Sequence, residues 1–153
     1  MIRDIPFWDK NTETMSRSDI EKIQLEGLKR QVEHALRTPY YQKRLKDADI
    51  SGPDCITTLA DIRNLPFTTK ADLRDAYPFG MLAVSKDDIV RIHASSGTTG
   101  TPTIIYHNKK DLDMASDTMA RSLVAAGCTR GDIVQNMMTY GLFTGGLGFH
   151  YGA

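Results

Sequence analysis

The stretch that decides the fold is His-Ala-Ser-Ser-Gly-Thr-Thr-Gly-Thr-Pro-Thr-Ile-Ile-Tyr, residues 93–106. Alternating apolar runs at 89–92 and 103–106 predict two short strands joined by a tight loop. The hydroxyl residues of this loop are Ser95, Ser96, Thr98, Thr99 and Thr101, and its glycines are Gly97 and Gly100. Hydroxyls donate hydrogen bonds, and glycine lets backbone N–H groups approach a ligand closely. The composition therefore indicates an anion-binding loop, and the alternative is a Ser- and Gly-rich surface turn.

The common nucleotide-binding fingerprints do not fit this loop. A Walker A loop requires a lysine after its second glycine, but the first lysine beyond the loop is Lys109. The glycine spacing of the dinucleotide-binding motif is also missing.

The loop resembles the phosphate-binding loop of the adenylate-forming superfamily, which includes acyl-CoA synthetases and luciferase-like enzymes. The pattern Ser/Thr-Ser-Gly-Thr-Thr-Gly-x-Pro-Thr matches residues 95–103 without a gap, although the family usually has lysine where this chain has Thr101. The resemblance implies that residues 96–100 bind the β- and γ-phosphates of ATP, with Ser95 and Thr101 at the margins. Backbone N–H groups, hydroxyls and Mg²⁺ would share the phosphate charge.

Length and composition place the chain among globular proteins with the size of one domain. It has 153 residues, of which 41% are apolar and 25% are charged, and its 19 basic and 19 acidic residues cancel. This balance gives no electrostatic reason to expect nucleic acid or a membrane as a partner. Cys55 and Cys128 form no metal-ligand or disulfide pattern, so a reducing, cytoplasmic location is expected.

The first half, residues 1–80, is predicted to be a helical lead-in. A capping box at Ser18–Glu21 predicts the start of a long helix that Pro39 ends. A second amphipathic helix is predicted over 40–48, and short capped helices are predicted over 57–64 and 69–76.

The second half, residues 81–153, is predicted to begin an α/β nucleotide-binding domain. Asn108 is a suitable N-cap for a helix that Gly127 ends, and Ile133–Met138 is predicted to be the next strand. Strand, helix and strand in this order are typical of a parallel crossover unit. The fold class is therefore α/β, with a helical lead-in and an incomplete parallel sheet.

The order of further motifs is similar to one branch of the superfamily, the phenylacetate–CoA ligases. The matching segments are Trp8-Asp9, residues 13–17, 65–74, 77–80, 120–123 and 140–148. The resemblance implies an AMP-forming ligase of phenylacetate catabolism. Such an enzyme uses ATP, Mg²⁺ and CoA to convert phenylacetate into phenylacetyl-CoA.

The glycine-rich segment from Tyr140 onward has two interpretations. Its glycines can let backbone lie against a flat apolar ligand, or they can allow close packing of a helix. The resemblance favours the first interpretation, with Tyr140, Phe143, Gly145 and Gly146 lining an aryl-acid pocket. His150 is interpreted as a hydrogen-bonded packing residue.

Other parts that the resemblance implies are not found in this sequence. These are the adenine-binding loop, the acidic residue for Mg²⁺, the ribose-binding Asp and the adenylation Lys. The chain is therefore expected to be the N-terminal part of a longer ligase, inactive by itself, with no catalytic residue and no metal ligand of its own. The expected partners are an aryl acid, ATP and CoA, together with a second copy in a homo-oligomer. The alternatives are a ligase for another aromatic or indolic acid and a non-catalytic nucleotide-binding or interaction module.

Overall fold

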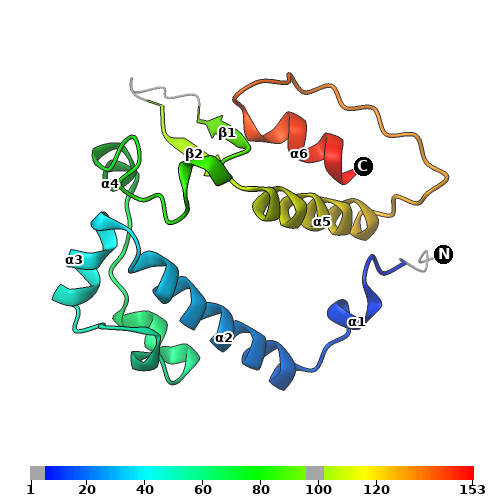
Figure 1. The fold of residues 1–153 in the computed structure, drawn as a ribbon. Helices are drawn as coiled ribbons and strands as arrows, with labels where there is room; N and C mark the ends of the chain where they lie inside the picture. The colour runs from blue at the N-terminus through cyan, green and yellow to red at the C-terminus, as the bar shows by residue number, and fades with distance from the viewer. Residues whose placement is uncertain (1–5, 96–101) are drawn as a thin grey trace. The chain divides into compact units, whose positions relative to one another are not determined.

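The structure is a computed structural model that describes residues 6–95 and 102–153. These residues form two compact units: a helical unit of residues 15–85, and a hairpin unit of residues 6–14, 86–95 and 102–153. The elements of each unit can be followed by their labels in Figure 1. The prediction of a domain boundary near residue 80 stays a prediction.

The helical unit is built on α2 (Arg17–Ala35) and α3 (Pro39–Asp47), followed by the 3-10 helices η1 (Pro53–Cys55) and η2 (Leu59–Asn64) and the short helix α4 (Lys70–Asp75). Its core consists of buried side chains from α2, α3 and the segment after α3: Val32, Leu45, Ile50 and Ile56. These residues come from separate elements, so the core joins α2, α3 and η1 by burying apolar area.

Side-chain caps fix where these helices begin. Ser16 is the N-cap of α2, and its hydroxyl accepts a hydrogen bond from the backbone N–H of Asp19 at 3.2 Å. The Ser16 hydroxyl also donates to the Asp19 carboxylate at 2.6 Å. The predicted capping box at Ser18–Glu21 was wrong, because α2 begins at Arg17 and Ser18 already lies inside the helix. The predicted helix over 40–48 and the cap at Thr69 were confirmed by α3 and by the capping box of Thr69 with Asp72.

Arg44 links α3 to the segment around α4. Its guanidinium donates to the Phe67 carbonyl at 2.7 Å and pairs with the Asp72 carboxylate at 3.0 Å. The amide and hydroxyl of Thr69 also donate to Asp72, and these hydrogen bonds are the largest reason that the Asp72 pKa lies below its ordinary value. The carboxylate therefore stays ionised and holds both partners.

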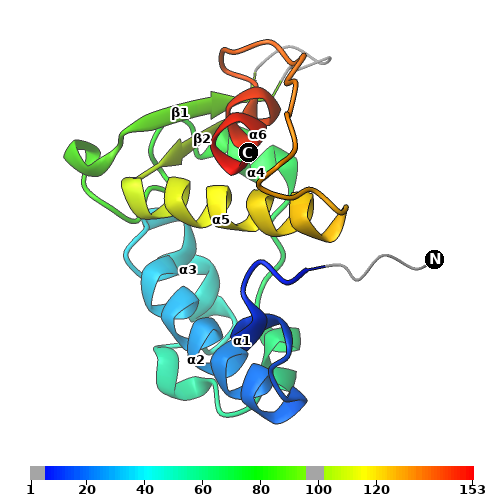
Figure 2. The same ribbon diagram turned by 90° about the vertical axis from the view of Figure 1, so that its right-hand side faces the viewer.

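The hairpin unit contains the two strands β1 (Arg91–Ala94) and β2 (Ile104–His107), the 3-10 helix η3 (Lys86–Asp88), and the helices α1 (Lys10–Glu13), α5 (Lys109–Ala125) and α6 (Thr144–Gly152). The strands pair antiparallel, with His93 opposite Ile105 and Ala94 opposite Ile104. The helix α5 follows β2 directly, and α6 lies against α5 (Figures 1 and 2). The predicted cap at Asn108 was confirmed, and Gly127 ends the helix with a positive φ of 96°.

One predicted element of the hairpin unit is not formed. Residues 133–138 have no strand partner, so the parallel pair expected from the order strand, helix, strand is missing from the described residues. The side chains of this segment include Ile133, which is fully exposed, and Met137, which is 85% exposed. The segment thus has the apolar composition of a buried strand without a neighbouring strand to cover it.

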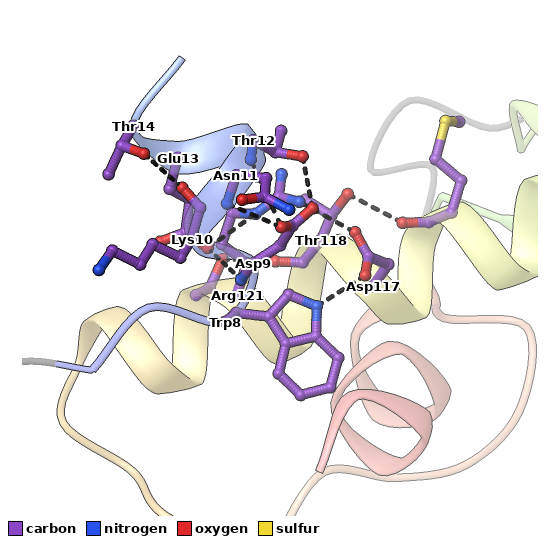
Figure 3. Close-up of polar contacts among 12 residues, drawn as sticks. Trp8, Asp9, Lys10, Asn11, Thr12, Glu13, Thr14, Asp117, Thr118 and Arg121 are labelled. Atoms are coloured by element: carbon purple, nitrogen blue, oxygen red, sulfur yellow. Dashed lines mark hydrogen bonds and ion pairs between the residues drawn. The ribbon is translucent and has the colours of Figure 1, made fainter.

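The N-terminal segment is attached to the outer face of α5 (Figure 3). The indole N–H of Trp8 donates to the Asp117 carboxylate at 2.6 Å, and Arg121 lies 3.5 Å from the Glu13 carboxylate. Arg121 also donates to Asp117 at 3.1 Å. Asp117 and Arg121 of α5 therefore contact each other and also contact the N-terminal segment, through Trp8 and Glu13. We call this group of four residues the N-terminal clasp.

The helices carry no sign of a membrane span. Among the described residues, none of them combines the length and the apolar character that crossing a bilayer requires.

Candidate functional site

The base of the predicted phosphate loop is a closed hairpin. The backbone N–H of Ser95 donates to the Thr103 carbonyl at 2.9 Å, and the N–H of Thr103 donates to the Ser95 hydroxyl at 3.2 Å. These bonds extend the β1–β2 ladder by one residue pair. The remaining predicted phosphate-binding residues lie outside the described residues: Ser96, Gly97, Thr98, Thr99, Gly100 and Thr101. The structure therefore places the two ends of the loop side by side.

The other edge of β1 carries the glycine-rich segment. Successive N–H groups of a strand point to opposite sides, so Ala94 faces away from β2 when Ser95 faces toward it. The Ala94 N–H donates to the Leu142 carbonyl at 2.8 Å. This bond brings the predicted aryl pocket and the base of the predicted phosphate loop to the same strand, although they are almost fifty positions apart in sequence.

Three buried polar atoms without a hydrogen-bond partner among the described residues lie on the hairpin: His93 Nδ1, Thr103 Oγ1 and His107 Nε2. The strand register puts all three side chains on one face, with His93 diagonal to the other two. His93 is 2% exposed and Thr103 is 6% exposed. Burying polar atoms without partners costs free energy, so we expect water or other groups to pair with these atoms.

The two histidines of this face are in contact. Their rings meet edge to face, with 5.0 Å between centroids. Burial lowers the pKa of His107 below its ordinary value, and the neighbouring His93 lowers it further. The charged groups that also act on His107 are Asp111, which raises its pKa, and Arg91, which lowers it. The hairpin therefore favours the neutral form of His107.

The predicted pocket residues lie together around the start of α6. Tyr140 is 53% exposed and Phe143 is 56% exposed, so about half of the surface of each residue is open to the surroundings. The Tyr140 hydroxyl lies 3.1 Å from His150 Nδ1, which agrees with the expected hydrogen-bonded role of that histidine. Their rings also meet edge to face at 5.6 Å.

The glycines Gly145 and Gly146 are required by packing against their own neighbours. A Cβ on Gly145 would lie 2.6 Å from the Phe143 ring, and one on Gly146 would lie 2.5 Å from the Thr139 carbonyl oxygen. Close packing therefore explains both glycines without a ligand. Their assignment to a pocket wall stays a prediction.

Asn136 is a residue of this site that the sequence analysis did not identify. Its side chain donates to the Gly146 carbonyl at 2.7 Å and to the Tyr140 hydroxyl at 3.3 Å. The signal that could have identified it is the pair of amides, Gln135 and Asn136, within the otherwise apolar run Ile133–Met138 that was interpreted as a strand. A polar residue in such a run needs a partner.

No metal site is found in the part of the chain that the structure describes. Within residues 6–95 and 102–153, no three His, Cys, Asp or Glu side chains come together in a way that could hold an ion. The Mg²⁺ that the family resemblance implies thus has no ligand set among these residues.

Comparison with known proteins gives close sequence relatives. No protein-family model matches the chain. A phenylacetate–coenzyme A ligase of Aromatoleum evansii is 49% identical over 92% of the chain, and one of Thermus thermophilus is 46% identical over 96%. The ligase of Escherichia coli is 46% identical over 92% of the chain. The chain matches phenylacetate–CoA ligases.

Two solved structures that resemble this fold are of a CoA ligase. A 2-hydroxyisobutyryl-CoA ligase in complex with 2-HIB-AMP and CoA superposes on 91% of the chain with a TM-score of 0.81 and 28% identity. An open conformation of that ligase gives a TM-score of 0.80 and 26% identity. The predicted fold class is thereby confirmed as that of the N-terminal part of an adenylate-forming CoA ligase, while the strands of the described residues form an antiparallel pair and not the expected parallel one.

The matches cover nearly all of this chain and a minor part of each relative. The chain spans about a third of the length of the phenylacetate–CoA ligases that it matches, between 32% and 33%. The activity of a whole phenylacetate–CoA ligase therefore depends on about two thirds of its length that this chain does not match.

Proposed function

We propose that the chain is the N-terminal part of an AMP-forming phenylacetate–CoA ligase and contributes its phosphate-binding loop. The observation that carries this proposal is the identity of 46–49% with curated phenylacetate–CoA ligases over almost the whole chain. The gapless match of residues 95–103 to the superfamily loop supports it independently.

The chemistry of the proposed reaction explains why such a loop is needed. A carboxylate resists attack by a thiol because oxide is a poor leaving group, so the acid is first converted with ATP into an acyl-adenylate, releasing diphosphate. The CoA thiolate then attacks the acyl carbon, and AMP leaves. Negative charge builds on the departing diphosphate in the first step, and N–H and hydroxyl donors of residues 95–101 stabilise it.

The arrangement of the hairpin unit supports one shared site for both reactants. The bond between Ala94 and Leu142 holds the predicted acid-binding segment beside the base of the predicted phosphate loop. An acid seated near Tyr140 and Phe143 would thus lie close to a triphosphate held by that loop. Such proximity lowers the barrier to adenylate formation because the reactants need not be brought together from solution.

The other reactants follow from the same proposal. ATP and CoA are co-substrates, and Mg²⁺ is expected to accompany the ATP phosphates, although the described residues contain no cluster of three His, Cys, Asp or Glu side chains that could hold it. The adenylation lysine and the adenine and ribose contacts are expected from the part of the ligase beyond this chain. We keep a cytoplasmic location and a homo-oligomer as expectations, and light scattering on the purified protein tests the second.

The test of the proposed function is thioester formation by the full-length ligase that carries this sequence. We expect phenylacetyl-CoA to form only when phenylacetate, ATP and CoA are all present. Changing Thr98 and Thr99 together to alanine removes two charge-assisted hydrogen bonds and should slow adenylation roughly 10²- to 10⁴-fold. The matched control is Thr118→Ala on the exposed side of α5, which should leave the rate unchanged.

Two outcomes would contradict the proposal. Thioester formation without ATP would exclude an adenylate intermediate, and a better rate with an indolic or another aromatic acid would replace phenylacetate as the substrate. The isolated 153-residue chain should form no acyl-CoA. If that chain binds a nucleotide or protein partner while the full-length protein has no ligase activity, the non-catalytic module is the correct interpretation.

A further inference from the structure

Asn136 reverses the usual pattern of burial in its segment. Residues 129–144 are all described, and every one of them except Asn136 is exposed. Its neighbours include Ile133, which is fully exposed, and Met137, which is 85% exposed. Hydrophobic burial alone would turn the apolar side chains inward and the amide outward. The amide of Asn136 therefore has inward contacts that the apolar side chains beside it lack.

The amide of Asn136 uses both kinds of hydrogen-bonding group that it has. Its Nδ2 donates to the Gly146 carbonyl at 2.7 Å and to the Tyr140 hydroxyl at 3.3 Å, and its Oδ1 accepts from the Met138 N–H at 3.1 Å. A backbone carbonyl can only accept and a backbone N–H can only donate, so these two contacts fix which way the amide faces. Asn136 thus joins its own segment to the first turn of α6.

The amide also contacts the Tyr140 hydroxyl in a way that leaves its proton available. Because Asn136 donates to the Tyr140 oxygen, the hydroxyl proton is free to be donated to His150 Nδ1, 3.1 Å away. The tyrosine ring is held at its outer end by two partners from two elements, while 53% of the residue stays exposed. An exposed aromatic ring held in one orientation is typical of a preorganised binding surface.

We propose that Asn136 is a positioning residue for the acid site. It holds the Tyr140 ring and the start of α6 in the arrangement that receives the aryl acid, and it does not touch the acid itself. The proposal rests on the proposed function, in which Tyr140 and Phe143 line the acid pocket.

The test compares Asn136→Asp and Asn136→Ala in the full-length ligase. Asp has the size of Asn but no N–H donors, so both variants lose the donation to the Gly146 carbonyl and to the Tyr140 oxygen. In Asn136→Asp the Tyr140 hydroxyl can pair with the carboxylate only by donating to it, which turns its proton away from His150. We expect the KM for phenylacetate to rise about 2- to 10-fold, the effect of losing the one hydrogen bond that positions Tyr140. The KM for ATP should stay unchanged. The matched control is Gln135→Ala, which removes an exposed amide one residue away and should leave both KM values unchanged.

A double-mutant cycle separates positioning from a general loss of stability. Tyr140→Phe keeps the bond between Asn136 and Gly146 and removes only the hydroxyl. If Asn136 acts through Tyr140, Asn136→Asp combined with Tyr140→Phe should raise the KM for phenylacetate less than the product of the two single effects. Independent effects, or an unchanged KM in Asn136→Asp, would overturn the proposal. If Asn136→Ala fails to fold, Asn136→Asp and Tyr140→Phe still give this answer.

A second readout uses the 153-residue chain and needs no activity. The side-chain NH₂ signals of Asn136 in a nitrogen–proton NMR spectrum should shift in Tyr140→Phe, while those of Gln135 should not. Unmoved Asn136 signals would contradict the bond to Tyr140. An inactive wild-type ligase would instead refute the proposed function, so the two failures are distinguishable.

Discussion

The helical unit and the segment 129–144 hold their shapes by different means. In the helical unit, apolar side chains from separate elements meet in one core, and Ile56 is only 1% exposed. In the segment, Ile133 is fully exposed, and the side chain that faces inward is the amide of Asn136. The first region is built to be stable by itself. The second leaves its apolar side chains exposed and is held by hydrogen bonds of Asn136 and Leu142.

The largest expected effect on stability comes from changing isoleucine to alanine in the core and comparing it with the same change in the segment. Ile56→Ala leaves a cavity in the core and should lower the free energy of unfolding by about 2–5 kcal/mol. Ile133→Ala removes the same atoms from a fully exposed position and should change it by less than about 0.5 kcal/mol. Urea denaturation of the 153-residue chain measures both. Similar values for the two variants would break the comparison.

A smaller difference in stability is expected between alanine substitutions at two glycines of α6. A Cβ on Gly146 would lie 2.5 Å from the Thr139 carbonyl oxygen, so Gly146→Ala should cost about 1–3 kcal/mol of stability. Gly148 has no atom within 4 Å of its Cβ position, so Gly148→Ala should stabilise the helix by about 0.5–1 kcal/mol. The measurement is the midpoint of thermal unfolding. Equal destabilisation by both variants would show that α6 is not packed as described.

The N-terminal clasp should contribute still less, because its groups are partly exposed. Asp117→Ala removes the acceptor of the Trp8 indole N–H and should cost at most about 1 kcal/mol. Trp8 is the sole tryptophan of the chain, so its fluorescence emission reports on the clasp directly. We expect the emission to change in Asp117→Ala and to stay the same in Asp113→Ala, which lies on the same helix and pairs with Lys109.

The smallest effect should be the pH dependence of the hairpin. The pKa of His107 lies below 6.5 in the folded chain, so the unfolded chain binds more protons as the pH falls toward that folded value. The contribution of His107 to stability is therefore present above pH 6.5 and is lost below it. His107→Asn should flatten the decrease in the free energy of unfolding between neutral and mildly acidic pH. An unchanged slope would show that His107 is not buried in its neutral form.

Local signals predicted the starts of helices in both units, because the residues next to a helix specify where it begins. Thr69 and Asn108 were identified as caps from their positions before apolar periodic runs, and the structure gives each of them the expected side-chain bond. The start of α2 was misplaced because Ser16 and Ser18 are both suitable caps. Only the geometry selects Ser16, whose hydroxyl bonds to Asp19.

Contacts between distant residues were not predictable from the sequence. The run Ile133–Met138 has the composition of a buried strand, but a strand needs a partner, and none is present among the described residues. The bond from Ala94 to Leu142 and the role of Asn136 depend on how the segment returns to β1. The assignment of the phosphate loop came from its motif, and most of that loop lies outside the described residues.

The N-terminal clasp has a consequence for how the chain acquires its structure during translation. Trp8 bonds to a residue 109 positions later, so the first part of the hairpin unit leaves the ribosome long before its partner. At ordinary rates of synthesis this delay is roughly 5–20 s. The helical unit, whose contacts are more local, has time to fold within that interval. Residues 8–13 are made before the helical unit and are thus among the last to reach their final contacts.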